Sequence, residues 1–351
     1  MTQQQLALSV LDLVPVRTGQ DSAHAVASSL ALVEAAERLG YQRFWYAEHH
    51  NMLSVGSTTP PVLIAAAAAR TQRIRLGSGG VMLPNHAPLV VAEQFAALEA
   101  LAPGRIDLGL GRAPGSDPVI TALLRSSGGG SDVEQFPRYV EDIALLASAE
   151  GAELSLTSGR TYTVRATPNA RSVPTVWLLG SSDYSARLAA KLGLPYVFAH
   201  HFSGEGTEQA LAIYRGEFTP GAIDAPRTFL TVNTVVADTD AEARALALPQ
   251  LLQMARLRSG EPMTTMPTVE EAAATELKPH HESLIASMRE RWVIGEADAA
   301  AEQLRALAAR FGVDEVMLSP VAGSREAEPL DGAGSRERTL ELVAGALRVS
   351  G

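Results

Sequence analysis

The stretch that decides the fold runs from residue 88 to residue 112 and reads PLVVAEQFAALEALAPGRIDLGLGR. From Val91 to Leu101 its apolar residues recur at three- and four-residue intervals, which places them on one face of a helix. Pro103-Gly104 then interrupts the helical pattern, and the short apolar run Ile106–Gly111 follows. We therefore predict an amphipathic helix, a turn and a buried strand, in this order.

The same alternation of helix and strand recurs along the chain. The predicted strands are Leu6–Leu13, Arg43–Ala47, Ile74–Ser78, Ile106–Gly111, Thr175–Leu179, Tyr196–Ala199, Phe229–Val236 and Asp314–Ser319. Helical patterns lie between them, and Gly40 and Gly312 close two of these patterns as C-cap glycines do. Eight such units predict an α/β fold, the (β/α)8 TIM barrel, with an open doubly wound sheet as the alternative.

Length favours the barrel, because eight units take about 250 residues and leave about 100 of the 351 for insertions. We place one insertion at about 112–174, after the fourth strand, and one at about 240–296, after the seventh. The first contains the flexible stretch Ser126–Ser131 and a helix near Glu134–Ala149, whereas the second is weakly patterned. Such segments are usually lids or binding loops. Without a linker or a repeat, residues 1–351 are expected to form a single domain.

Composition excludes several classes of protein. With 46% hydrophobic and 19% charged residues, the chain can bury a large core. The absence of cysteine excludes a disulfide scaffold, a thiolate metal site and a cysteine nucleophile. A net charge of −10 argues against nucleic acid as a partner. Met1–Gln5 carries no positive charge and the longest apolar run, Pro60–Ala69, is too short for a bilayer, so we expect a cytoplasmic protein.

In a barrel, functional residues gather at the C-terminal ends of the strands. The second predicted strand ends in Ala47-Glu48-His49-His50-Asn51. A carboxylate beside two imidazoles can orient a heterocycle, move a proton or bind a metal. A metal needs further ligands, and adjacent strand residues point to opposite faces, so no metal is predicted here. A capped loop with a hydrogen-bonded histidine pair is the structural alternative.

Glycines mark the next two strand ends. The third ends in Gly77-Ser78-Gly79-Gly80, where glycines inside a strand indicate either a ligand close to the backbone or a plain bulge. The fourth ends in Leu108–Gly115, which lacks both the Rossmann glycine spacing and the Walker lysine. It leaves one arginine among small residues. Arg112 can bind a phosphate in bidentate fashion or pair with a neighbouring carboxylate.

The fifth predicted strand ends in Gly180–Ser185, which contains three serines, and a helix begins at once. Serines at a helix N-terminus cap it and offer an anion site, so a phosphate can lie between them and Arg112. The sixth strand ends in His200-His201-Phe202, a second histidine pair at the same rim. A flat glycine wall, a phosphate corner and several histidines together indicate a phosphorylated heterocyclic cofactor that carries the chemistry.

Several segments of the chain resemble the luciferase-like flavin monooxygenases. They are Arg43–His50, Gly77–His86, Ala92–Phe95, Pro103–Gly115, Leu178–Ser182, Lys191–Phe202 and Val293–Gly295. The resemblance runs in order over nearly the whole chain, and Glu48-His49-His50 and Gly104–Arg112 are its most specific stretches.

The resemblance implies a TIM barrel, usually a homodimer, that takes reduced FMN (FMNH2) from a separate flavin reductase. Oxygen adds to C4a of the flavin, and the peroxyflavin oxidises a bound small organic substrate. Some relatives use the deazaflavin F420 and transfer hydride, which is the first alternative, and a non-catalytic flavin-binding protein is the second. Beyond Arg112 no basic cluster follows the strands, which counts against the long anionic tail of F420.

The resemblance also assigns roles to residues. His49 would be the catalytic acid or base beside the flavin ring, with Glu48 as its neighbouring carboxylate. Gly79-Gly80 matches a pair that often forms a non-prolyl cis peptide against the flavin, and Arg112 would hold the FMN phosphate. The implied cofactor-binding residues are Gly79, Gly80, Gly111, Arg112, Ala113, Tyr139, Gly180, Ser181, Ser182 and His200, with Ser185 as a further candidate.

Two features set the chain apart from bacterial luciferase itself. The reactive cysteine that lies beside the flavin there falls here at Gly111, so oxidation of long-chain aldehydes and light emission are not expected. The second insertion aligns poorly, so the sequence does not identify the substrate. Side chains of that insertion that can line a substrate pocket are Met254, Met263, Met266, His280, His281 and Trp292.

Overall fold

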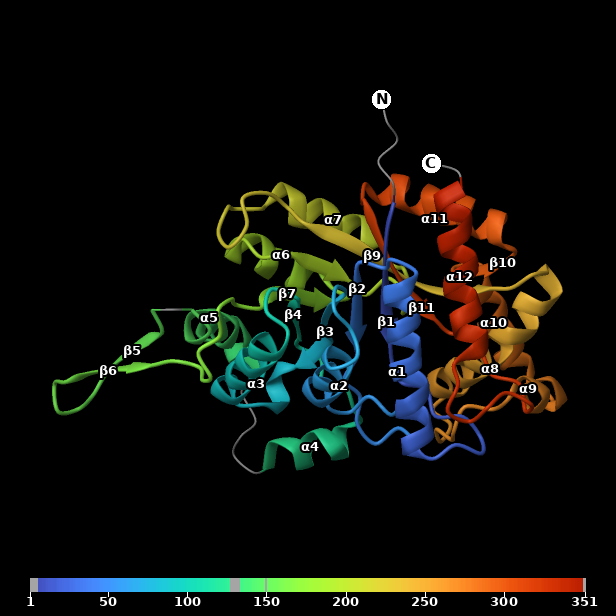
Figure 1. Ribbon diagram of the computed structural model, residues 1–351, viewed down its shortest axis with the longest axis horizontal. Coiled ribbons are helices and arrows are strands. Elements are labelled where there is room, and N and C mark those ends of the chain that lie inside the picture. Colours follow the sequence, from blue (N-terminus) through green and yellow to red (C-terminus); the bar gives the residue numbers. More distant parts are fainter. Residues whose placement is uncertain (1–5, 127–132, 149, 350–351) are drawn as a thin grey trace.

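The computed structural model describes residues 6–126, 133–148 and 150–349 (Figure 1). In these ranges eight parallel strands form a closed barrel: β1 (Ala7–Asp12), β2 (Arg43–Tyr46), β3 (Arg75–Met82), β4 (Ile106–Gly111), β7 (Thr175–Gly180), β8 (Tyr196–Phe198), β9 (Thr228–Val236) and β11 (Glu315–Pro320). Each strand pairs with the next, and β11 pairs with β1 to close the ring. The predicted TIM barrel is therefore confirmed over the open sheet.

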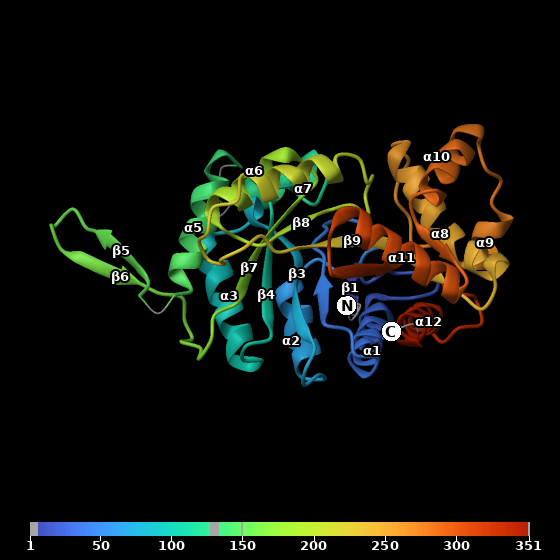
Figure 2. The same ribbon diagram turned by 90° about the horizontal axis from the view of Figure 1, so that it is seen from above.

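Helices surround the barrel, as the view from above shows (Figure 2). They include α1 (Ser22–Arg38), α2 (Pro60–Ala68), α3 (Pro88–Leu101), α6 (Asp183–Leu192), α7 (Thr207–Gly216), α11 (Ala297–Phe311) and α12 (Gly334–Val349). The predicted C-cap at Gly312 is present, because this residue ends α11 at φ 59°, where a side chain would be strained. None of the helices in the described ranges has the length and apolarity needed to cross a membrane.

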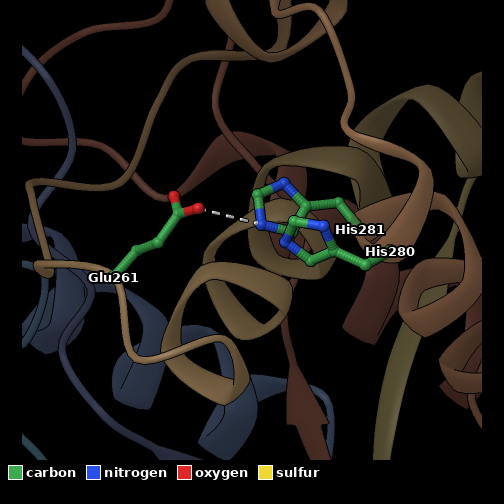
Figure 3. A group of neighbouring side chains, drawn as sticks. All are labelled: Glu261, His280 and His281. Atoms are coloured by element: carbon green, nitrogen blue, oxygen red, sulfur yellow. Dashed lines mark ion pairs between the residues drawn. The ribbon is translucent and has the colours of Figure 1, made fainter.

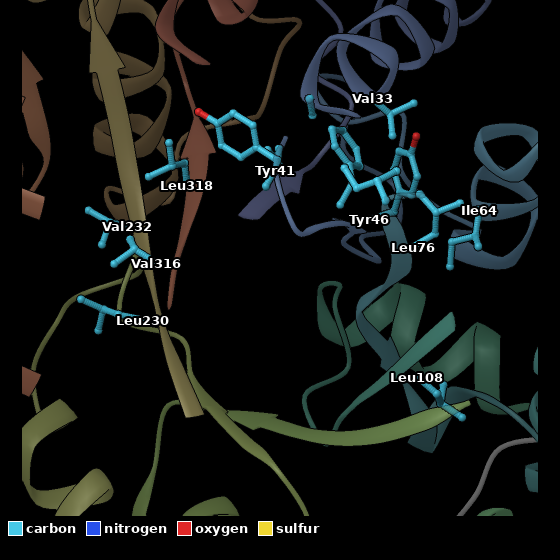
Figure 4. Packing of buried hydrophobic residues seen from close by; sticks show 14 of the residues in the cluster. Val33, Tyr41, Tyr46, Ile64, Leu76, Leu108, Leu230, Val232, Val316 and Leu318 are labelled. Carbon is cyan, nitrogen blue, oxygen red and sulfur yellow. The ribbon is translucent and has the colours of Figure 1, made fainter. Parts of the chain in front are cut away.

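The main hydrophobic core fills the layer between the barrel and the helices. Val33 of α1 and Ile64 of α2 pack toward Tyr46 of β2 and Leu76 of β3 (Figure 4). All four are buried, as their positions on the apolar faces of amphipathic helices and buried strands predict. This packing fixes the strands, and with them the side chains that follow their C-terminal ends.

The N-terminal end of the barrel interior is closed by a buried ion network. The Arg43 guanidinium donates to Asp107 at 2.7 Å and to Glu315 at 2.6 Å, and the Arg43 side chain has no exposed surface. Trp45, directly above, donates its indole N–H to the same aspartate at 3.1 Å. Charges and aromatic rings therefore fill this end of the barrel interior.

The first insertion, between β4 and β7, contains α4 (Pro118–Ser126), α5 (Phe136–Leu146) and a hairpin of β5 (Ala152–Ser155) and β6 (Thr161–Val164). Helix α5 matches the helix predicted near Glu134–Ala149. The hairpin projects away from the barrel (Figures 1 and 2) and was not predicted. Residues 127–132, most of the predicted flexible stretch, lie outside the described residues.

The second insertion, between β9 and β11, is mostly helical rather than irregular. It contains α8 (Asp240–Arg258), α9 (Val269–Ala274), α10 (Pro279–Arg289) and β10 (Val293–Gly295), which adds to the edge of β9. Thr239 caps α8, and Thr268 with Glu271 forms a capping box at α9. These helices lie beside the C-terminal ends of β9 and β11, where they can form one wall of a site.

Candidate active site

A cavity of about 650 Å³ opens at the C-terminal ends of the barrel strands. Its volume is in the range that holds cofactors and small molecules. The predicted residues that line it are His49, Gly79, Gly80, Gly111, Arg112, Ala113, Gly180, Ser181, Ser182 and the further candidate Ser185. Glu48, Tyr139 and His200 are not part of this lining. Tyr139 lies on α5, half-buried against the core around the barrel.

The glycine wall of the cavity is a bulge in β3. The register between β3 and β4 shifts between Ser78 and Val81, and the peptide bond between Gly79 and Gly80 is cis, as the resemblance implies. A Cβ atom on Gly79 would lie 2.7 Å from Leu11 Cδ1, and one on Gly80 would lie 2.8 Å from the Gly109 carbonyl oxygen. There is no room for a side chain, so bare backbone faces the cavity.

His49 stands beside this wall with its ring in the cavity. Its backbone N–H donates to the Ser57 carbonyl oxygen at 3.0 Å, which fixes the chain after β2. The ring Nδ1 is buried and has no hydrogen-bond partner among the described residues. Burial lowers the pKa of His49, and the nearby Glu48 charge offsets this only in part. A neutral imidazole therefore lines the cavity.

Glu48 lies behind the wall and is 1% exposed. One oxygen accepts hydrogen bonds from His50 Nε2 and His86 Nε2, both at 2.8 Å, and the other accepts from the Met82 backbone N–H at 3.0 Å. Burial raises the pKa of Glu48, but these hydrogen bonds outweigh it and hold the pKa below its ordinary value. The carboxylate thus connects the loops after β2 and β3 and holds His49 in place indirectly.

A cationic corner of the cavity lies at the ends of β4 and β7. The Arg112 guanidinium carbon lies 3.9 Å from the centre of the Tyr184 ring, and no carboxylate in the described part of the chain pairs with it. The alternative prediction of a salt bridge is therefore wrong among these residues. Ser181 and Ser182 lie at the N-terminus of α6, and neither hydroxyl caps the helix. Asp183, the acidic residue of this turn, accepts a hydrogen bond from Gln209.

Sequence analysis missed a second arginine in this cavity. Arg125, on α4, lines it and its Nε is buried without a hydrogen-bond partner among the described residues. It lies beyond the fourth strand end, inside an insertion, so strand position gave no signal for it. Arg112 and Arg125 thus place two cations without a carboxylate partner among the described residues at one cavity, and guanidinium groups of this kind can bind a phosphate.

In the second histidine pair, the residue that lines the cavity is not the predicted one. His201 lines the cavity, whereas His200 Nδ1 bonds Thr207 Oγ1 at 2.8 Å and its ring packs on Phe311. Val197 packs inside the barrel, and the two-residue period of a strand carries that orientation to His201. The two-residue period was therefore the signal in the sequence that could have identified His201. Burial lowers the pKa of His201 to about 3, so this imidazole is neutral too.

A smaller hollow of about 80 Å³, here called the lobe, lies beside the cavity. Its walls come from β1, β9, the end of β11, α8 and α12, and from the segments that follow β1, β8, α8 and β11. Leu11, Leu13, His201 and Phe202 line both spaces. Of the side chains predicted for a substrate pocket, Met254 and Met266 line the lobe, whereas Met263, His280, His281 and Trp292 line neither space.

One group in the described ranges has metal-ligand chemistry (Figure 3). None of its three residues lines the cavity. Glu261 faces His280 and His281 of α10, with its Oε1 3.3 Å from His281 Nε2. Lys278 Nζ lies 2.5 Å from the same oxygen. The lysine ammonium already neutralises this carboxylate, so a metal ion would have to displace it.

A family model described as luciferase-like monooxygenase matches residues 7–315. A luciferase-like monooxygenase of Escherichia coli (strain K12) is 44% identical over 268 residues, 74% of this chain and 76% of that protein. The N-acetyl-S-alkylcysteine monooxygenase of Bacillus subtilis (strain 168) is 38% identical over 219 residues, 62% of this chain and 64% of that protein.

Solved structures show the same likeness. Apo-MsnO8 matches with a TM-score of 0.82 at 35% identity over 98% of each chain. The oxygenating constituent of a Pseudomonas putida 3,6-diketocamphane monooxygenase in complex with FMN has a TM-score of 0.72 at 18% identity over 97% of each chain. An F420-dependent secondary alcohol dehydrogenase has a TM-score of 0.65 at 13% identity over 98% of this chain and 99% of that one. These last two share the fold. Family model, relatives and fold agree with the resemblance seen in the sequence: the chain belongs to the luciferase-like monooxygenase family.

Proposed function

We propose that the protein is a flavin-dependent monooxygenase that receives reduced FMN from a separate reductase and uses O2 to oxidise a small organic substrate. The observation that carries the proposal is the cavity itself. One side holds two arginines without carboxylate partners in the described chain, and the other presents bare glycine backbone beside a neutral histidine. A phosphate and a flat ring on one molecule match these two sides.

In this proposal the residues bind, orient and move a proton. Arg112, Arg125 and Ser181 would hold the phosphate of FMN. The Gly79-Gly80 backbone would lie against the ring, where a side chain on either glycine would collide with its neighbours. Reduced flavin supplies the electrons that activate O2 for insertion of one oxygen atom into the substrate.

His49 would exchange a proton with the reacting oxygen. Its pKa is lowered by burial, so the ring is neutral at neutral pH and can either accept a proton at the free nitrogen or donate one from the other. Leu11 and Leu13 line the same space and exclude water from it. Glu48 acts as a positioning residue through His50 and the β3 backbone.

F420 is the competing ligand. Its tail carries more anionic groups than FMN, and Arg112 and Arg125 are the only Lys or Arg residues among the described residues that line the cavity. Two cations match one phosphate better than an extended polyanionic tail. This supports FMN, and a direct competition between the two cofactors decides it.

The test is an anaerobic titration of the purified protein with FMN, reduced FMN and F420, followed by tryptophan fluorescence. Oxygenated buffer is then mixed in while the flavin spectrum is recorded. We expect reduced FMN to bind most tightly and the mixing to give a transient absorbance distinct from oxidised flavin. Binding of F420 alone would replace the proposal with hydride transfer. Flavin binding without turnover on any substrate of a broad panel would favour a non-catalytic flavin-binding protein.

A further inference from the structure

The lobe joins the main cavity at the point where the proposed chemistry takes place. His201 and Leu11 line the lobe and the cavity, and both also border a small space beside Gly79. A molecule held in the lobe would therefore reach the glycine wall and the neutral histidines. The phosphate corner lies on another side, at the ends of β4 and β7. A ligand in the lobe would therefore not compete with the cofactor phosphate for the same residues.

We propose that the lobe is the substrate subsite and that it selects a compact, uncharged, largely apolar group with one hydrogen-bonding atom placed near Gln250. That the lobe ligand is the substrate rests on the proposed monooxygenase function, whereas the preference for an uncharged, largely apolar group follows from the residues of the lobe alone.

The two charged residues of the lobe wall neutralise each other. Asp12 pairs with Arg336 at 2.9 Å, and the two residues are 2% and 5% exposed. Asp12 also accepts from the Val14 backbone N–H at 2.9 Å and from Ser29 Oγ at 2.5 Å, and Arg336 donates to Ser28 Oγ at 2.9 Å. An ion entering the lobe would lose its hydration without gaining a counter-charge, which is unfavourable.

The amide of Gln250 on α8 is an uncommitted polar group of the wall, because it lines the lobe and makes no hydrogen bond within the described part of the chain. The amide of Asn233 on the same wall instead donates to the His201 carbonyl oxygen at 2.8 Å. The free amide can donate to or accept from one polar atom of a ligand.

The lobe is small and its wall is held in place. About 80 Å³ is roughly half the volume of an engineered cavity that binds benzene, so it encloses about half of a small ring, whose other half reaches the cavity. Pro249 of α8 packs on Gly323, where a Cβ would lie 2.5 Å from Pro249 Cγ. The Gly323 N–H also donates to the Leu246 carbonyl oxygen at 2.7 Å. This contact limits how far α8 can move away to admit a long chain.

The experiment measures binding of cyclopentanone and cyclopentanecarboxylate to the full-length protein without flavin, by saturation-transfer NMR. The two probes share a ring and differ in charge. We expect cyclopentanone to bind at least tenfold more tightly. Met254→Trp, which fills the lobe, should abolish its binding. Met263→Trp is the matched control, because this methionine lies in the same insertion and lines neither space, and it should bind as wild type does.

Gln250→Leu should weaken cyclopentanone binding about fivefold, as loss of one neutral hydrogen bond predicts. Equal binding of the two probes, or unchanged binding by Met254→Trp, would overturn the proposal, and the wild-type comparison holds even if a variant fails to fold. Calorimetry with FMN is run separately on the same proteins. Absence of FMN binding with the expected probe selectivity would refute the flavin proposal and leave the lobe as a binding site for neutral molecules.

Discussion

The guanidinium of Arg112 at the end of β4 stacks on the ring of Tyr184 at the start of α6, with 3.9 Å between its carbon and the ring centre. A cation–π contact fixes the position of the arginine without neutralising its charge. The donors at the edge of the guanidinium therefore stay available. Two elements that are far apart in the sequence thus hold the arginine that we propose binds the FMN phosphate.

Arg112→Ala should weaken FMN binding about 10- to 100-fold, because a charged hydrogen-bond donor to the phosphate is lost. Riboflavin, which has the same ring and no phosphate, should bind the variant and the wild type about equally. Isothermal calorimetry with both ligands measures the difference. Arg138→Ala, at a highly exposed position on α5, is the control and should leave both affinities unchanged. An equal loss for riboflavin would show that Arg112 supports the fold rather than the phosphate.

His49→Ala should keep FMN affinity within a few-fold of wild type and lower kcat by about 10²–10⁴, the usual contribution of a general acid or base. Because burial lowers the pKa of His49, the acid limb of the wild-type kcat profile should lie below the ordinary histidine value of 6.5. Stopped-flow turnover across pH measures both. His24→Ala, on the exposed face of α1, is the control. Wild-type turnover in His49→Ala would exclude the proton-transfer role.

Gly79→Ala should destabilise the protein by about 1–3 kcal/mol, the usual cost of overpacking, because the new methyl group would meet Leu11 Cδ1. Leu11→Ala in the same chain removes that atom and should restore part of the loss. Gly80→Ala should not be rescued by Leu179→Ala, since the Gly109 carbonyl oxygen remains 2.8 Å away. Urea unfolding of the single and double variants gives the coupling energies. Equal recovery of stability in the Gly79/Leu11 and Gly80/Leu179 double variants would contradict a collision with the Gly109 carbonyl oxygen.

The barrel could be predicted from the sequence because each strand is an apolar run bounded by turn residues. The residues that follow the predicted strands include most of those that line the cavity. The sequence was not sufficient where contacts between residues far apart in the chain determine the structure. Arg43 meets Glu315 across 272 positions, which no local pattern records. Arg125 reaches the cavity from an insertion, and His201 depends on the phase of a strand of three residues. Helix α8 lacks one clear apolar face, so its segment resembled a loop.

Glu48→Gln should lower the stability of the fold at about pH 7 and have less effect near about pH 4. The folded-state pKa of Glu48 lies below its ordinary value, so its ionised form stabilises the fold above that value. The contribution is lost as the pH falls through the folded-state pKa. Thermal unfolding of variant and wild type across pH measures the difference. A gap between the two that widens toward acid would contradict the assignment of Glu48 as an ionised link between loops.

His201→Gln should impair substrate oxidation more than His200→Gln does, because His201 borders both the cavity and the lobe while His200 bonds Thr207 behind the wall. Glutamine keeps a hydrogen-bonding group at each position, so the comparison is matched in size and polarity. The measurement is kcat/KM for the best substrate together with FMN affinity. We expect His201→Gln to lower kcat/KM at least tenfold with FMN affinity nearly unchanged. A larger loss in His200→Gln would instead favour the assignment that family resemblance alone implies, with His200 in contact with the flavin.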